Sequence, residues 1–191
     1  MALYGADLRP RLRRNLRAGP SVSTVMRVKD REAEFKDFYF AEAGKLKRLA
    51  VLMVGDADRA EDLTHDALLR AYKAWGRIRG DDPGPYIRQA LVNGCRNHLR
   101  RRAVERRKAP SAPADAPDSS PSLVEAMRVS AALSVLSPVR KAAVLLRFYE
   151  DLPLEEIAQI LDRPVNTIKS DLRRALDQLR PILEENVREK A

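Results

Sequence analysis

Four polar side chains on one face of a basic segment have the chemistry to bind DNA. Within residues 165–180, apolar residues recur at helical spacing, and the opposite face is polar. The residues on that polar face are Lys169, Ser170, Arg173 and Arg174. Their ammonium, hydroxyl and guanidinium groups donate hydrogen bonds to phosphate oxygens and to base edges. The pattern predicts a DNA-binding helix; the alternative is an ordinary helical hairpin with a solvated basic face.

The residues that precede this segment predict a helix-turn-helix. A first short helix has its apolar face at Leu154, Ile157, Ala158 and Leu161. Asp162 tolerates a left-handed backbone and Pro164 disfavours helical geometry at Arg163, so we expect a tight turn there. Asn166 or Thr167 is then expected to cap the second helix. The apolar stripe of this helix comprises Ile168, Leu172, Ala175, Leu176 and Leu179.

A second polar stripe follows one face of a helix predicted from Tyr86 to about Glu105, with Pro85 in its first turn. The stripe consists of Gln89, Asn93, Arg96, Asn97 and Arg100, and it continues into Arg101, Arg102, Arg106, Arg107 and Lys108. Glu105 is the only acidic residue between Ile87 and Lys108, whereas a solvated face usually mixes charges. Amides and guanidiniums beside an aromatic residue suit an unpaired nucleic-acid strand. The alternative is a solubilising face.

An acidic cluster marks the start of the helix predicted at 57–75, which follows a stop at Gly55 and a cap at Asp56. The acids are Asp58, Glu61, Asp62 and Asp66. Carboxylates near a helix N-terminus are each favoured by about 0.3–1 kcal/mol, which accounts for some of them. Four within nine residues of a basic chain favour a docking face for a basic protein partner.

Composition favours a polyanionic partner. The 191 residues carry a net charge of +9, and only 5% are aromatic. No apolar run approaches the roughly 18 residues of a membrane span, so we expect no membrane association. The single cysteine, Cys95, excludes an internal disulfide and fits a reducing cytoplasm.

The residues that could carry catalysis or bind a metal do not form a recognised site. Asp62, His65 and Asp66 lie on adjacent helical turns, but that helix has no second histidine. Cys95 and His98 fall on an apolar side, where packing explains them. Phosphate-binding glycine loops, nucleophile elbows and zinc-finger spacings are absent from the sequence. We therefore expect neither an enzyme nor a cofactor or metal.

These segments predict an all-α chain with two small helical domains joined by a flexible linker. The divisions are a disordered basic arm at 1–25, with Met26 as an alternative start, a first domain at 26–108, a Pro/Ala/Ser linker at 109–121, a second domain at 122–185 and a tail at 186–191. An extended linker of this length reaches roughly 40 Å, more than one turn of duplex DNA. The two domains could therefore contact one DNA molecule at separate places.

Two motifs in this order resemble a known family. The segment AEDLTHDALLRAYKAW, followed by PYIRQALVNGCRNHLRR, resembles regions 2.2 to 2.4 of bacterial sigma-70 factors. The segment LSPVRKAAVLLRFYEDLPLEEIAQILDRPVNTIKSDLRRALDQLR is similar to their region 4. A chain with only these two domains resembles the extracytoplasmic-function (ECF, group 4) sigma factors.

The resemblance implies a cytoplasmic, non-enzymatic subunit of RNA polymerase that directs promoter-specific initiation. It implies partners in the core polymerase (the β′ clamp helices and the β flap) and in promoter DNA, allows an anti-sigma factor, and suggests a monomer when free. Contacts to the −35 element are carried over to Lys169, Ser170, Arg173 and Arg174. Contacts to the −10 element are carried over to Arg77, Arg79, Tyr86, Asn93, Arg96, Asn97 and Arg100. Docking on the core polymerase is carried over to Asp62, Leu63, His65, Asp66 and Leu69.

Three residues depart from the family pattern. Tyr86 replaces a frequent tryptophan, and Asn166 replaces a frequent glycine but can act as a cap. Asp171 stands where a neutral or basic residue is usual, and we expect it to alter −35 preference by accepting a bond from cytosine N4 or by orienting Arg174. The alternative functions are a stand-alone helix-turn-helix regulator, which leaves the acidic helix and the Asn/Arg stripe unexplained, and a protein that binds only other proteins.

Overall fold

The computed structural model describes residues 22–79, 82–108 and 121–189, and within these ranges the regular elements are all helical. The helices are α1 (Val22–Val54), α2 (Ala57–Ile78), α3 (Gly84–Lys108), α4 (Pro121–Ala132), a short 3-10 helix η1 (Leu133–Val135), α5 (Pro138–Phe148), α6 (Leu154–Leu161) and α7 (Val165–Glu189). The expected all-α class is confirmed. Most of the predicted linker and of the basic arm lies outside the described residues.

Some helix ends agree with the start and stop residues predicted from the sequence, and others do not. Gly55 adopts φ +74°, and the Asp56 carboxylate accepts a hydrogen bond from the Arg59 amide at 2.9 Å, which confirms the predicted stop and cap. Two boundaries differ from expectation. Helix α1 begins at Val22, inside the predicted arm. Helix α2 continues to Ile78, three residues beyond the end predicted at Trp75.

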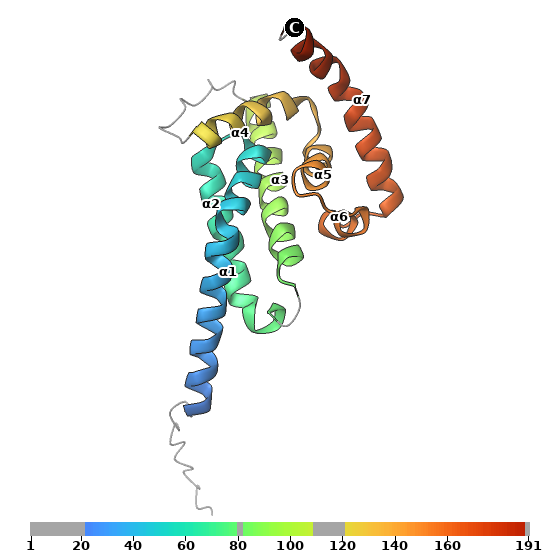
Figure 1. Cartoon of the computed structure of the whole chain (residues 1–191). Coiled ribbons are helices and arrows are strands. Elements are labelled where there is room, and N and C mark those ends of the chain that lie inside the picture. Colours follow the sequence, from blue (N-terminus) through green and yellow to red (C-terminus); the bar gives the residue numbers. More distant parts are fainter. Residues whose placement is uncertain (1–21, 80–81, 109–120, 190–191) are drawn as a thin grey trace, which may run out of the picture.

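The first three helices pack together around the apolar faces that their spacing predicted. Helices α1 and α2 run side by side, and α3 packs against both (Figure 1). The buried side chains include Leu49, Met53, Leu68, Trp75, Ile87 and Leu91. Phe35 and Phe38 of α1 lie against Trp75, with ring centroids 5.1 and 5.3 Å away. This bundle fixes the direction in which the polar stripe of α3 faces.

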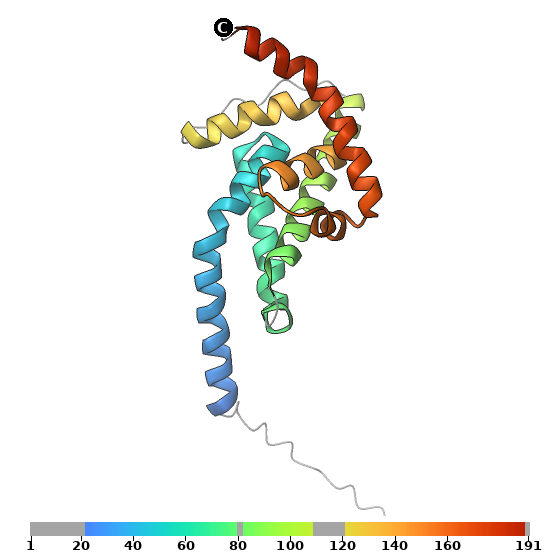
Figure 2. The ribbon, with the colours of Figure 1, turned by 45° about the vertical axis from the view of Figure 1, so that its right-hand side comes forward.

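Helices α4, α5 and α6 lie against the bundle, and α7 packs on α5 and α6. Figure 1 shows α5, α6 and α7 on the side of α3 that faces away from α2, and Figure 2 shows α4 across the end of the bundle. Helices α5 and α6 both contact α3, and α4 contacts α1. Buried residues of the two halves form one continuous core in the described residues. No helix in these ranges is long and apolar enough to cross a membrane.

Gly55 joins α1 to α2 and lies against Ser130 of α4, and a side chain there is expected to destabilise the fold. Its left-handed backbone costs an L-residue about 1–2 kcal/mol, and an added Cβ would lie 3.0 Å from the Ser130 hydroxyl oxygen of α4. We expect Gly55→Ala to lower the free energy of unfolding by about 1–2 kcal/mol, measured by urea denaturation. Gly44→Ala is the control, since its Cβ would meet nothing within 4 Å. Equal stability of the two variants would contradict the prediction.

Candidate nucleic-acid interface

The outer face of α7 presents the predicted basic side chains. Lys169, Arg173 and Arg174 are exposed, while Ser170 is half-buried and donates a hydrogen bond to the Thr167 carbonyl at 2.9 Å. The inner face is buried against α5 and α6 through Ile168, Leu172, Ala175 and Leu179. Leu176, expected in that stripe, is 43% exposed, so the apolar face is narrower than predicted.

The turn between α6 and α7 confirms one expectation and corrects another. Asp162 ends α6 with φ 52°, the predicted left-handed conformation. Helix α7 begins at Val165, where the Thr167 and Ile168 amides donate to the Pro164 carbonyl at 2.9 and 3.1 Å. Asn166 and Thr167 therefore lie inside the first turn and do not cap the helix.

Asn166 is a candidate contact that sequence reasoning missed. Its side chain is exposed on the first turn of α7, three and four residues before Lys169 and Ser170. Positions three and four apart share one helix face. The N-terminal residues of a recognition helix are the ones that reach base edges, so this position belongs to the candidate face.

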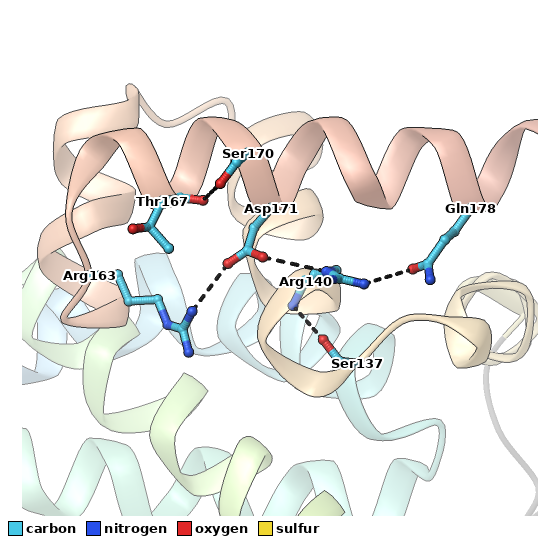
Figure 3. Close-up of polar contacts among 7 residues, drawn as sticks. All are labelled: Ser137, Arg140, Arg163, Thr167, Ser170, Asp171 and Gln178. Carbon is cyan, nitrogen blue, oxygen red and sulfur yellow. Dashed lines mark hydrogen bonds and ion pairs between the residues drawn. The ribbon is translucent and has the colours of Figure 1, made fainter.

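Asp171 does not belong to that face. Figure 3 shows its carboxylate between two arginines on neighbouring segments. One carboxylate oxygen accepts from Arg140 Nε of α5 at 3.4 Å, and the other accepts from Arg163 Nη1 in the turn at 3.3 Å. Arg140 also donates to the Gln178 side chain at 3.3 Å. The residue is only 7% exposed, so the expectation that it meets cytosine or orients Arg174 is wrong.

The packing of α6 covers part of the polar stripe of α3 and leaves the rest exposed. Asn93, Asn97 and Arg100 are exposed, as a nucleic-acid contact requires. Gln89 donates from its amide nitrogen to the Gln159 carbonyl of α6 at 3.2 Å. Arg96 is half-buried, and burial, followed by the charges of Arg100 and Arg163, lowers the pKa of its guanidinium.

The other residues carried over to the −10 element surround the N-terminal end of α3. Arg77 is exposed in the last turn of α2. Arg79 donates to both carboxylate oxygens of Glu34 at 3.1 and 2.9 Å. Tyr86 is half-buried and packs against the core. A nucleic acid would therefore compete with Glu34 for the Arg79 guanidinium.

The acidic surface of α2 is less negative than its sequence indicates. Lys47 of α1 contacts Glu61 at 2.6 Å, and this hydrogen bond lowers the pKa of the Glu61 carboxyl. Arg59 pairs with Asp62 at 3.1 Å. Asp62, His65, Asp66 and Leu69 are exposed, as docking on a protein requires.

Leu63 supports this surface from beneath. It is buried against α3, where a Cβ at Gly94 would lie 3.3 Å from its Cδ2 atom. Leu63 therefore has no exposed side chain to offer a docking partner, and the expectation that it belongs to the docking surface is wrong.

Comparisons with known proteins agree with this arrangement. The family model "Sigma-70 region 2" matches residues 38–105, and "Sigma-70, region 4" matches residues 126–179. The RNA polymerase sigma-E factor of Streptomyces avermitilis is 32% identical over 153 residues, which cover 79% of this chain and 86% of that protein. The ECF RNA polymerase sigma factor SigL of Mycobacterium tuberculosis is 27% identical over 161 residues, covering 80% and 90%.

A solved structure supports the fold. The sigma factor RpoE of Bartonella quintana, in complex with the anti-sigma factor NepR, aligns with a TM-score of 0.62 and 24% identity. The alignment covers 78% of this chain and 96% of that chain. Most of α3 and the first part of α7 lie within the residues that the two family models match.

Proposed function

Because the chain belongs to the extracytoplasmic-function group of the sigma-70 family, we propose that it binds core RNA polymerase and directs promoter-specific transcription initiation. In this proposal α7 contacts the −35 element through Lys169, Ser170, Arg173 and Arg174. Helix α3 and the C-terminal end of α2 contact and open the −10 element. The residues proposed for this are Arg77, Arg79, Tyr86, Asn93, Arg96, Asn97 and Arg100. The observation that carries the proposal is the presence, on one chain and in this order, of both family regions with an exposed polar helix in each.

The chemistry of RNA synthesis stays in the polymerase, and this chain supplies specificity. Exposed guanidiniums and amides on α7 suit phosphates and base edges of duplex DNA. Those on α3 suit a single strand, because a positively charged surface follows its backbone and arginines interact with the faces of its unstacked bases. We propose that Asp62, His65, Asp66 and Leu69 dock on the β′ clamp helices and that the α4–α7 half binds the β flap. The same proposal places the protein in the cytoplasm, as a monomer when free, with an anti-sigma factor as a further partner.

Run-off transcription tests the proposal directly. Core polymerase is supplied with a panel of promoter templates, with and without the protein. Transcripts that appear only with the protein support the proposal, and their start sites identify both promoter elements. If the protein does not enable the core polymerase to initiate but still binds duplex DNA in a gel-shift assay, the proposal is wrong. The chain is then a stand-alone helix-turn-helix regulator.

One substitution tests the assignment of α7. We expect Arg174→Ala to lower transcription from a responsive promoter about tenfold at limiting protein, since one arginine contact to DNA is worth about 1–3 kcal/mol. Arg180→Ala is the matched control, because Arg180 is exposed on the same helix and pairs only weakly with Asp177, at 3.8 Å. Equal transcription by the two variants would remove Arg174 from the −35 surface.

A further inference from the structure

A cleft of about 480 Å³ lies where α4, η1 and the start of α5 meet the C-terminal parts of α1 and α3. Figure 2 shows α4 crossing the end of the bundle at this place. The residues that line the cleft come from both of the ranges that the family models match, 38–105 and 126–179. The DNA-contact residues proposed above are not among them.

Lys141 of α5 brings a buried positive charge to this cleft. The residue lines the cleft, and its Nζ donates to the Ser130 carbonyl at 2.9 Å and to the Ser130 hydroxyl at 2.8 Å. An ammonium group has three N–H donors, so one remains unused by these two bonds. The described residues provide neither a third acceptor nor a carboxylate in salt-bridge contact with it. A buried charge without a counter-charge is costly, so this ammonium favours an anion beside it.

Arg102 of α3 brings a second positive charge to the same cleft. Its side chain is half-buried, and it has no salt bridge to any residue that the structure describes. The exposed hydroxyl of Ser134 is a further hydrogen-bond donor on the cleft wall. Among the residues that line the cleft, none is an aspartate or a glutamate. The cleft therefore carries two cations and no acid within the described part of the chain.

The rest of the cleft wall is mainly apolar. Leu99 of α3, Met127 of α4 and Leu136 before α5 are among the side chains that form it. Sites for small molecules are concave, mostly apolar and about 300–1,000 Å³ in volume, with a few polar groups that fix the orientation of the ligand. The size and the lining of this cleft fit that description. The two cations select a negative charge, and the apolar wall selects a hydrocarbon body.

We propose that this cleft binds a small amphipathic carboxylate. The carboxylate group lies among Arg102, Lys141 and the Ser134 hydroxyl, and its hydrocarbon body packs against the apolar wall. Binding gives the buried ammonium the counter-charge that the described residues do not supply. Charge-assisted hydrogen bonds to a carboxylate are roughly twice as strong as neutral ones. Binding at this cleft does not depend on the proposed role in transcription.

Octanoate is the probe that tests the proposal. It is titrated into the full chain by isothermal calorimetry at constant ionic strength, well below the concentration at which it forms micelles. 1-Octanol has a similar hydrocarbon body without the charge, and inorganic phosphate has the charge without the body. We expect saturable binding of octanoate at one site, and binding at least tenfold weaker for the two comparison compounds. Amide chemical shifts in NMR should change most at Ser130 and Ser134.

Two variants remove the cations one at a time. We expect Lys141→Met and Arg102→Gln each to weaken octanoate binding about tenfold or more, because each loses a charge-assisted hydrogen bond. Arg101→Gln is the matched control, since it removes the same charge from the neighbouring, exposed position of α3 and should bind octanoate as the unaltered protein does. Arg102 is half-buried, so this variant retains the test if Lys141→Met alters the packing of α5.

Each other outcome overturns the proposal. Absence of octanoate binding shows that the cleft is not a ligand site of this class. Equal affinity for 1-octanol shows that the cations play no part, and equal affinity for phosphate shows that the apolar wall plays none. Equal weakening by Arg101→Gln and Arg102→Gln shows that octanoate responds only to the general positive charge of α3.

Discussion

Changing Asp171 to alanine is expected to lower the free energy of unfolding by about 2–3 kcal/mol. The carboxylate is buried between Arg140 and Arg163, and its loss leaves two guanidiniums near each other without their shared counter-charge. Removing one partner of a buried pair costs more than the pair contributes, because the remaining charge stays desolvated. Urea denaturation followed by circular dichroism measures the change.

A matched acid on the same helix provides the control. Asp177 is 60% exposed and pairs with Arg180 at 3.8 Å, so Asp177→Ala should cost less than about 1 kcal/mol. Promoter preference of the Asp171→Ala protein, tested below its unfolding temperature, should match that of the unaltered protein. A change in −35 preference without a loss of stability would return Asp171 to the DNA-binding face (Figure 3).

Local periodicity was sufficient to predict the helices and most of the core. Ile157, Ala158 and Leu161 of α6, and Ile168 and Leu172 of α7, are buried as their spacing predicted. Such patterns report which face of each helix is apolar and therefore which face packs inward. The exposed basic face of α7 follows from the same rule.

What periodicity could not predict depends on contacts between distant parts of the chain. Arg88 and Glu150 are 62 residues apart, and the spacing of charges on α3 carries no signal of that partner. Asp171 appeared to belong to the polar face of α7, yet arginines from α5 and the preceding turn bury it. A polar residue at the edge of a stripe is exposed or buried according to what packs beside it. The sequence of one helix does not contain that information.

The start of α7 shows that contacts between neighbouring residues can also be mispredicted from the sequence. Asn166 and Thr167 are good caps in isolation, but the amides of Thr167 and Ile168 already bond to the Pro164 carbonyl. Proline fixes its own φ, which suits the position just before a helix. Helix starts predicted from cap residues alone therefore shift by about one or two residues.

The buried ammonium of Lys141 is expected to make stability depend on pH. Lys141 is 5% exposed, and its Nζ donates to the Ser130 carbonyl at 2.9 Å and to the Ser130 hydroxyl at 2.8 Å. Burial lowers the pKa of this lysine from 10.5 to about 8. Between these two pH values the unfolded chain binds more protons than the folded chain, so stability rises with pH. The gain is up to about 3 kcal/mol, at 1.36 kcal/mol for each pKa unit.

Other groups titrate in the same pH range, and their contributions to the unfolding free energy must be subtracted. Burial raises the pKa of the Cys95 thiol to about 12, so that group contributes in the opposite direction above pH 9. We therefore expect the difference in unfolding free energy between the unaltered protein and Lys141→Met to rise by about 3 kcal/mol from pH 8 to pH 10.5. Losing the bonds to Ser130 shifts this difference equally at every pH. Lys73→Met, at an exposed position of α2, is the control. A flat curve for Lys141→Met would show that its ammonium reaches water in the folded protein.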